Sequence, residues 1–313
     1  MGGGGGGWTA TETDDNIPAA AGPFGPRPVP RRSGVRDVTG AAKHGARTAG
    51  AAVHMIDLHN HLIPGVDDGA ASADDACAGI SAMHGQGFTA AVCTPHVSGA
   101  LTRDPAALAA RLAELDAGWD VLRAAAADGP DFALHRGAEV MLDTPEPDLS
   151  DARLRMAGTR FVLVEFPFMA VPPNAAAALF ELRMKGWEPL LAHPERYANA
   201  ASDLSDAAEW RRVGARLQVN AGSLAGRYGD RPHRLAWKLL EEGMADYVAS
   251  DFHTRGRVHT ADAAAEMDRR GGREARLLLT ETNPARLLSG ESPLAVPPVP
   301  RPRRGWRRLL GGG

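Results

Sequence analysis

The sequence predicts an α/β fold in which short parallel strands alternate with helices. Three observations support this prediction. Apolar runs alternate with stretches of helical periodicity from residue 55 to residue 288, and no shift in composition marks a domain boundary between them. Histidines and acidic residues recur directly after the predicted strands. Such repetition favours a parallel sheet, and about seven strands favour a sheet that closes into a barrel.

Seven short apolar segments are predicted as strands. Each is bounded by glycine, proline or charged residues, which is typical of strands that alternate with helices. In chain order they cover residues 55–58, 89–93, 132–139, 161–166, 189–192, 217–220 and 247–250.

Helices are predicted between these strands. The first begins at two acidic residues, Asp74 and Asp75, which favour a helix amino terminus, and stops at Gly85. The second has apolar residues at alternating steps of four and three, and these form one helix face: Leu108, Leu112, Leu115, Trp119 and Leu122. The later helices are predicted at residues 175–185, 205–213, 232–242, 261–270 and 273–280.

The two ends of the chain have a non-globular composition. Residues 1–54 combine a glycine run with scattered prolines and charges of both signs, which is typical of disorder. They are either a disordered extension or precede a translation start at Met55. Residues 291–313 are rich in proline and arginine and are predicted as a disordered tail. A solvated tail is the simpler interpretation, and contact with an anionic membrane surface or partner is the alternative.

The composition excludes several classes of protein. The net charge of -3 gives no reason to expect a nucleic-acid partner. Two cysteines, Cys77 and Cys93, are too few for a disulfide framework or a thiolate zinc site. No apolar run approaches the ~18 residues of a transmembrane helix. We therefore expect a cytoplasmic protein.

Histidines and carboxylates follow six of the seven predicted strands. Because the carboxyl ends of parallel strands lie on one face of a barrel, these side chains are expected to meet there. Imidazoles and carboxylates without a thiolate suit Mn, Fe or Zn. The residues, in chain order, are His59 and His61, His96, Glu139, Glu165, His193, and Asp251 with His253.

Each of these residues has an ordinary alternative when it is considered alone. A His-x-His pair can arise by chance, a carboxylate at a strand end is often a helix cap or half of an ion pair, and His193 could be a buried structural histidine. Glu165 is flanked by apolar residues, so an unpaired charge there would be costly and a cation is the better partner. The repeated placement therefore indicates a metal cluster. His44, His54, His84, His135, His233 and His259 lack this placement and are expected to be surface or structural residues.

Several motifs resemble those of a known family. The segment MIDLHNH at residues 55–61, followed by DDG at 67–69, resembles the opening motif of the PHP (polymerase and histidinol phosphatase) superfamily. With IPGVDDGA at 63–70, the sequence is similar to the bacterial tyrosine-protein phosphatases of capsule and exopolysaccharide operons. The remaining motifs of that branch are GAE at 137–139, AHPERY at 192–197, SDFH at 250–253 and NP at 283–284.

This resemblance implies a distorted seven-stranded (β/α) TIM-like barrel at residues 55–290, with three divalent metal ions. Mn²⁺ is the expected ion, with Fe or Zn as alternatives. Glu139 would bridge two of the three sites. The implied ligands are His59, His61, Glu139 and Asp251 for the first ion, Asp68, His96 and His253 for the second, and Glu139, Glu165 and His193 for the third.

The resemblance also implies a metal-dependent phosphotyrosine protein phosphatase that uses a metal-activated hydroxide. Its expected partner is a phosphotyrosine protein, in particular a tyrosine autokinase of polysaccharide biosynthesis or export. Neither cysteine begins a Cys-x5-Arg loop, which excludes the cysteine-phosphatase mechanism. Arg196 is the candidate cation for the phosphate oxygens, because a guanidinium matches them in shape. Its alternative is an ion pair with Glu195 or another nearby acid, and Arg255 and Arg257 are next in line.

Two other functions remain open. One is a small-molecule phosphoesterase, such as a histidinol-phosphate phosphatase on the same barrel. The other is a non-catalytic barrel that binds and regulates a kinase. The DDG and HPERY segments favour the protein phosphatase over the first alternative, and the complete set of possible metal ligands argues against the second.

Overall fold

Every strand pair in the described part of the chain is parallel. The computed structural model describes residues 54–144 and 146–302. Its strands are β1 (Met55–Asp57), β2 (Phe88–Cys93), β3 (His96–Ser98), β4 (Ala133–Arg136), β5 (Glu139–Met141), β6 (Phe161–Glu165), β7 (Glu188–Ala192), β8 (Arg216–Asn220) and β9 (Tyr247–Ala249).

The strands form two sheets, ordered β1-β2-β4 and β3-β5-β6-β7-β8-β9. Only Thr94 and Pro95 separate β2 from β3, and only Gly137 and Ala138 separate β4 from β5. Backbone hydrogen bonds continue across both breaks, from Gly137 N to Cys93 O (2.9 Å) and from Glu139 N to Pro95 O (3.0 Å). Each pair therefore acts as one bent strand that passes from the first sheet to the second.

All seven predicted strands are present, but one of them is interrupted and another is followed closely by an additional strand. Strand β3 was not predicted, and the expected strand 132–139 is divided into β4 and the start of β5. Pro95 has no N–H to contribute to a ladder. At Gly137, an added Cβ would lie 3.0 Å from the Val92 side chain, so a larger residue would crowd that side chain. Both residues lie at the bends, which apolar periodicity alone does not reveal.

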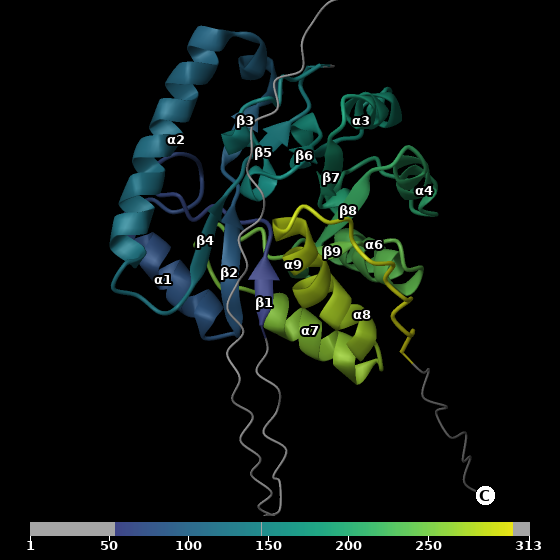
Figure 1. Ribbon diagram of the computed structural model, residues 1–313. Helices are drawn as coiled ribbons and strands as arrows, with labels where there is room; N and C mark the ends of the chain where they lie inside the picture. The colour runs from purple at the N-terminus through teal and green to yellow at the C-terminus, as the bar shows by residue number, and fades with distance from the viewer. Residues whose placement is uncertain (1–53, 145, 303–313) are drawn as a thin grey trace, which may run out of the picture. The chain divides into compact units, whose positions relative to one another are not determined.

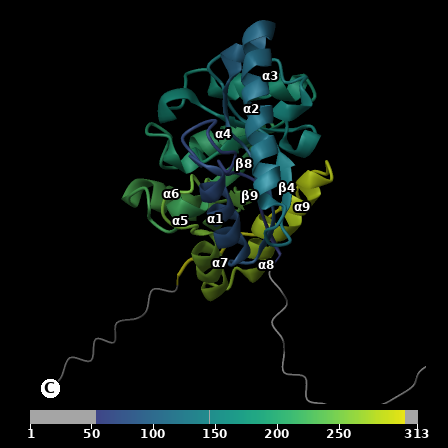
Figure 2. The same ribbon diagram turned by 90° about the vertical axis from the view of Figure 1, so that its left-hand side faces the viewer.

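The helices lie outside the strands (Figure 1). Figure 2, seen from the side of α1 and α2, shows these two helices in front of the strands. All predicted helices are present, and the last continues through a wide turn at Leu278–Thr282 into α9. The helices are α1 (Ala73–His84), α2 (Pro105–Ala126), α3 (Ala175–Met184), α4 (Ser205–Arg212), α5 (Ala221–Leu224), α6 (Asp230–Glu241), α7 (Thr260–Arg269), α8 (Arg273–Leu277) and α9 (Asn283–Leu288).

Local chemistry explains where the first two helices begin. The Ser72 side chain accepts a hydrogen bond from Asp75 N and caps α1. Asp104 accepts from Ala106 N and Ala107 N and caps α2, whose first residue is proline.

The central strands β6 and β7 are buried along their whole length. This matches a parallel sheet that is shielded from solvent on both faces.

The segment 291–302 differs from the predicted disordered tail. Val299 is 1% exposed, and its N–H donates to Leu240 O at the end of α6 (2.9 Å). Leu294 exchanges two hydrogen bonds with the Asn283 side chain. The few apolar residues between the prolines are enough to anchor this segment. Its overall composition, which is rich in proline and arginine, gives no sign of this anchoring. The remainder of that tail, and residues 1–53, lie outside the described residues.

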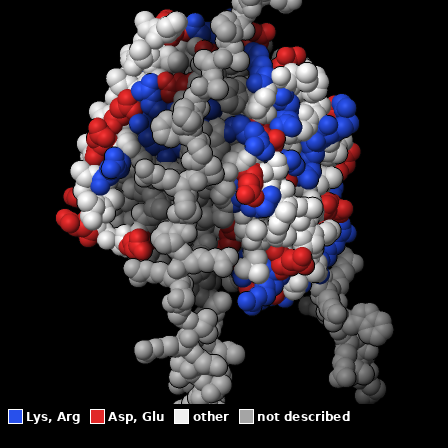
Figure 3. Space-filling model, viewed as in Figure 1, with Lys and Arg blue, Asp and Glu red and all other residues white. Residues whose placement is uncertain are grey.

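The described surface carries charges of both signs. Figure 3 shows basic and acidic side chains intermixed on one face, in keeping with the small net charge of -3. Among the described residues, no helix combines the length and the apolar character that crossing a bilayer requires.

Candidate metal centre

The structure brings all nine predicted ligands together, at the carboxyl ends of β1, β6, β7 and β9 and at the bends that precede β3 and β5. His59 and His61 follow β1, Asp68 lies in the loop between β1 and α1, and Glu165 ends β6. The other positions are His96 at the start of β3, Glu139 at the start of β5, His193 after β7, and Asp251 and His253 after β9. Glu139 was expected to end its strand. Because that strand bends at Gly137, Glu139 instead begins β5 and still faces the other ligands.

Four buried side chains form the innermost part of this cluster. The Nε2 atoms of His59 and His61 lie 3.4 Å apart. His59 Nε2 lies 3.1 Å from Glu139 Oε2 and 3.4 Å from Asp251 Oδ1. The corresponding distances from His61 Nε2 are 3.5 Å and 3.6 Å. Two imidazoles and two carboxylates therefore point their donor atoms at one small volume.

Glu139 connects this group to its neighbours. Its Oε1 lies 3.1 Å from His193 Nε2, and its Oε2 lies 3.2 Å from His96 Nδ1. His96 Nδ1 also lies 3.2 Å from Glu165 Oε1. A carboxylate with two oxygens facing different imidazoles has the geometry of a bridging ligand.

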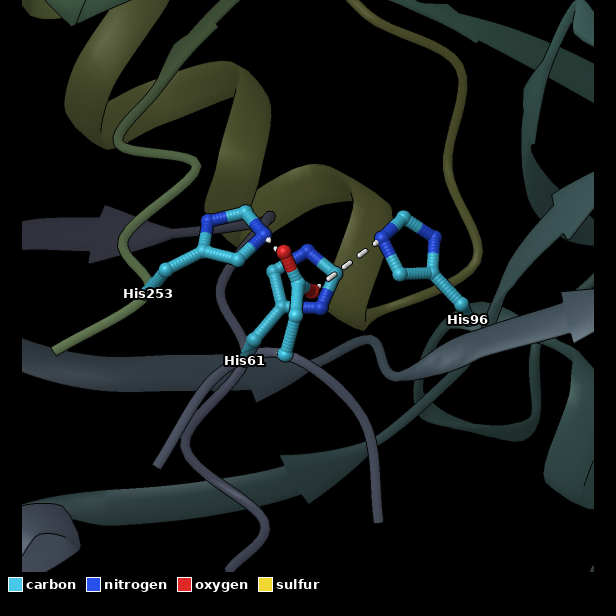
Figure 4. Close-up of side chains that lie close together, drawn as sticks. His61, His96 and His253 are labelled. Atoms are coloured by element: carbon cyan, nitrogen blue, oxygen red, sulfur yellow. Dashed lines mark ion pairs between the residues drawn. The ribbon is translucent and has the colours of Figure 1, made fainter. Parts of the chain in front are cut away.

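The outer part of the cluster faces solvent. Asp68 Oδ1 lies 3.3 Å from His253 Nε2 and 3.6 Å from His96 Nε2, and His61 lies between those two histidines (Figure 4). The rings of His61 and His253 stack with centroids 3.9 Å apart. The Asp68 side chain is 59% exposed, whereas the His61 side chain is fully buried. The centre therefore has a closed inner side and an open outer side.

Neighbouring side chains orient the possible ligands. Gln218 Oε1 lies 2.9 Å from His59 Nδ1, and Asp67 Oδ2 lies 2.8 Å from His61 Nδ1. A proton on each Nδ1 leaves the Nε2 lone pair free for a metal. Asn220 donates to Asp251 Oδ2 at 2.7 Å. No role was predicted for Gln218 or Asn220, although two polar residues inside an apolar strand were a usable signal.

Two possible ligands have strained backbones. His193 and Asp251 have φ angles of 34° and 49°, which non-glycine residues rarely adopt. Such strain persists where the surroundings hold it, often at functional sites. The N–H of Asp251 donates to His59 O at 2.8 Å, which ties the loop after β9 to the loop after β1.

The electrostatics of the centre favour cations. Burial lowers the pKa of His59, but Glu139 and Asp251 more than offset it and raise that pKa to about 9. Burial also opposes charge on His61, yet hydrogen bonds to Asp251 and Asp67 and the charge of Glu139 raise its pKa to about 10. The same contacts lower the pKa of Glu139 and of Asp251 despite burial. The carboxylates thus make the centre favourable for positive charge.

Metal ions would neutralise these carboxylates more completely than protons on the histidines alone. Glu139 Oε2 is buried and has no hydrogen-bond partner among the described residues. His59 and His61 point Nε2 atoms at each other, an arrangement that a shared cation stabilises. The donor atoms divide into four overlapping groups of at least three within 4.8 Å of one another. This His, Asp and Glu donor set can hold divalent ions.

Arg196 lies beside the centre and not in open solvent. Its Nη1 is 2.6 Å from Asp251 Oδ2, and its guanidinium lies 4.2 Å from the centroid of the Tyr228 ring. The ion pair that the sequence analysis kept as an alternative is therefore present, with Asp251 and not Glu195 as the partner. The Arg196 side chain is 23% exposed, so it also borders the opening. Arg257, by contrast, pairs with Asp262 on the surface.

The remaining histidines behave as expected where they are described. His54, His84, His135, His233 and His259 belong to none of the groups of possible metal ligands in the described residues. His233 instead donates from Nδ1 to Ser223 O. His44 lies outside the described residues.

This protein has a parallel α/β fold, and imidazoles and carboxylates cluster on one face of it. That combination is typical of metal-dependent enzymes. The residues of the present cluster come from separate loops of that one face. The chain belongs to the family described as "Capsular polysaccharide synthesis, CpsB/CapC", whose profile matches residues 55–289.

Curated relatives support this assignment. The tyrosine-protein phosphatase YwqE of Bacillus subtilis is 33% identical over 256 residues, which cover 80% of this chain and 98% of that protein. The putative tyrosine-protein phosphatase CapC of Staphylococcus aureus is 28% identical, over 64% of this chain and 77% of that protein. A solved structure from a study of YwqE and Streptococcus pneumoniae CpsB, described as metal-dependent tyrosine phosphatases, superposes with a TM-score of 0.66 at 31% identity. It covers 80% of this chain and 100% of that chain.

Proposed function

We propose that this protein is a metal-dependent protein-tyrosine phosphatase. The observation that carries the proposal is the convergence of nine imidazole and carboxylate side chains at one strand-end face. The relatives named tyrosine-protein phosphatases support the same activity. The two cysteines offer no competing nucleophile, because Cys93 is buried and Cys77 is only partly exposed.

We infer that the centre holds three divalent ions, with Mn²⁺ expected and Fe or Zn as alternatives. Bound divalent ions would activate water and neutralise charge on the phosphoryl oxygens. Glu139 belongs to two of the four donor groups, which supports a bridging role. The proposed ligands are His59, His61, Glu139 and Asp251 for one ion, Asp68, His96 and His253 for a second, and Glu139, Glu165 and His193 for a third.

The remaining residues of the site position these ligands and the substrate. Gln218 and Asp67 keep a proton on Nδ1 of His59 and His61, so that both Nε2 atoms face inward. We assign Arg196 to the phosphate, since its guanidinium borders the opening and presents further N–H donors beyond its bond to Asp251. The solvent-facing side at Asp68 is where a phosphorylated side chain would enter.

We also propose that the two sheets close into a distorted seven-stranded barrel. Asn60 and Phe252, which follow β1 and β9, form a parallel bridge. Asp57 at the end of β1 accepts hydrogen bonds from Ser250 N and Ser250 Oγ. These contacts join the first strand to the last, as closure requires.

The partner we propose is a tyrosine autokinase of polysaccharide biosynthesis or export. Membership of a capsular polysaccharide synthesis family supports this choice. We place the reaction in the cytoplasm, where ATP is available to a kinase. We assign no partner or surface to the arginine-rich residues 303–313.

One assay tests the activity directly. The purified protein, loaded with Mn²⁺, is compared on a phosphotyrosine peptide and on histidinol phosphate. We expect much faster turnover of the peptide, loss of activity with a chelator, and recovery when Mn²⁺ is restored. A clear preference for histidinol phosphate, or full activity of protein shown by elemental analysis to lack metal, contradicts the proposal.

A further inference from the structure

Phe168 is the most exposed of the large apolar side chains in the described residues. Its exposed fraction is 97%, compared with 67% for Met184 and 45% for Phe180. It lies three residues after Glu165, in the loop that leaves β6 on the same face as the metal centre. An aromatic ring that is fully open to solvent beside a site is a candidate contact for a ligand or partner.

The loop holds Phe168 in a strained but defined conformation. Phe168 and Met169 have φ angles of 56° and 51°, both in the left-handed region. Met169 O accepts a hydrogen bond from Ala198 N at 2.9 Å. The Asn199 side chain accepts from Val171 N (2.7 Å) and donates to Val171 O (3.0 Å). The segment that follows Arg196 therefore anchors the backbone of this loop, which holds the Phe168 position at the surface.

A surface pocket of about 220 Å³ lies between the two ends of this loop and neighbouring elements. Phe166 and Pro172, which flank the loop, line the pocket together with Leu142 and Ala178. One lining residue, Leu142, is bonded to a proposed ligand, since Leu142 N donates to Glu165 O at 2.8 Å. The polar residues Asp143, Thr144 and Asn174 complete the lining, so the hollow has an apolar and a polar part between the ends of the loop that carries Phe168.

We propose that Phe168 and the apolar part of this pocket form a subsite for an apolar side chain next to the phosphotyrosine of a protein substrate. The inference rests on the proposed function and names a feature of its substrate. A polypeptide that places a phosphorylated side chain at the strand-end face must cross the loops of that face, whereas a small phosphate ester does not reach them. A loop whose backbone is already anchored favours binding, because little backbone freedom is lost when the substrate binds.

The test compares three variants on three substrates. The variants are Phe168→Ala, Phe168→Leu and, as a matched control, Met184→Ala, which removes an exposed apolar side chain at the far end of α3. The substrates are a phosphotyrosine peptide flanked by leucines, the same peptide flanked by serines, and phenyl phosphate. All are assayed with the Mn²⁺-loaded protein, and kcat and KM are measured separately.

We expect Phe168→Ala to lower kcat/KM for the leucine-flanked peptide about 5- to 20-fold, mainly through KM. Turnover of phenyl phosphate and of the serine-flanked peptide should change less than about twofold. Phe168→Leu should restore much of the loss, and Met184→Ala should have no effect. These results together would separate a substrate contact from a change in the metal centre.

Three outcomes overturn the inference. Equal losses on phenyl phosphate and on the leucine-flanked peptide would place Phe168 in the reaction centre or its support. An unchanged kcat/KM for the leucine-flanked peptide would leave the ring without this role. A change from oligomer to monomer in Phe168→Ala, measured by sedimentation, would assign the ring to self-association. If the wild-type protein hydrolyses no phosphotyrosine substrate, the proposed function itself fails, which is a distinguishable result.

Discussion

Arg196 has two contacts that bear on its role. It pairs with Asp251, a proposed metal ligand, and its guanidinium stacks on Tyr228. Asp251 also accepts from Asn220 and lies 3.4 Å from His59, so it keeps other partners when the guanidinium is removed. This arrangement separates metal binding from phosphate binding in a way that mutation can test.

Arg196→Ala should spare the metal ions and reduce turnover. The loss of one charge-assisted phosphate contact costs about 2–4 kcal/mol in the transition state, or roughly 30- to 1000-fold in rate. Arg196→Lys should recover only part of it, because the guanidinium fork is lost. Metal content and kcat/KM are measured on the same samples. Glu139→Ala serves as the comparison and should lose both metal and turnover.

Two results contradict this role for Arg196. Metal loss as severe as that of Glu139→Ala would make the arginine a support for Asp251. Normal activity with the metals intact would move the phosphate contact to another cation, and Arg227, which also lies over the Tyr228 ring at 5.7 Å, is the first to examine.

Gln218 should control metal affinity although it is not a ligand. Gln218→Leu removes the acceptor for His59 Nδ1–H, so the ring loses its orientation. We expect metal affinity to fall about 10- to 100-fold, as for other residues that orient a ligand. Titration of the metal-depleted protein measures this. Gln86→Leu, which removes a glutamine bonded to Val258 O far from the centre, should bind metal normally; equal weakening in both variants would disprove the specific role.

The element that most changes the expected domain organisation is the segment 291–302. It was predicted to be disordered, yet Val299 is buried against α6, and Arg301 pairs with Glu241 and Glu242. Exposed ion pairs of this kind add little stability, so the buried valine is the main anchor. The folded unit therefore extends beyond the residues that the family profile matches.

Val299→Ala should destabilise the protein without affecting catalysis. The loss of two buried methyl groups costs about 1–2 kcal/mol, which lowers Tm by about 3–8 °C in a body of this size. Calorimetry and kcat/KM on the phosphotyrosine peptide measure the two effects. Leu294→Ala, at a side chain that is 45% exposed, should change Tm less. If Val299→Ala leaves Tm unchanged, the segment does not stabilise the fold.

At the scale of the whole molecule, the metal centre connects distant parts of the chain. Its proposed ligands follow or begin six different strands, from β1 to β9. An ion held by several of them binds only the folded state, so it stabilises that state by mass action. The same ligands crowd carboxylates together, and only protonated histidines offset this repulsion when the ions are removed.

Metal depletion should therefore lower the thermal stability of the whole domain. A site at a hundredfold excess of ion over Kd contributes about 2.7 kcal/mol. Calorimetry of the Mn²⁺-loaded and chelator-treated protein should show a fall in Tm of several degrees, which is reversed by Mn²⁺. Glu139→Ala should show a smaller difference between the two states. An unchanged Tm in protein that demonstrably binds Mn²⁺ would mean that the strand ends hold their positions without the ions.

The sequence by itself determined the repeating strand–helix order and the position of the possible ligands after the strands. These features follow from short-range periodicity and from residue types at element ends, which a linear pattern records. It also predicted one face for eight of the nine residues, because parallel strands send their carboxyl ends the same way; Asp68 was expected only from the resemblance to the family. The structure agrees with both predictions, because the predicted residues lie close together in it.

Only the tertiary structure decided the bends between β2 and β3 and between β4 and β5, the partner of Arg196, and the exposure of Phe168. It also decided that Gln218 orients His59 across 159 residues of sequence and that Val299 packs on α6. Each of these depends on contacts between residues that are distant in the chain. Local periodicity carries no information about such contacts, because side chains that are distant in the chain meet only after the backbone has folded.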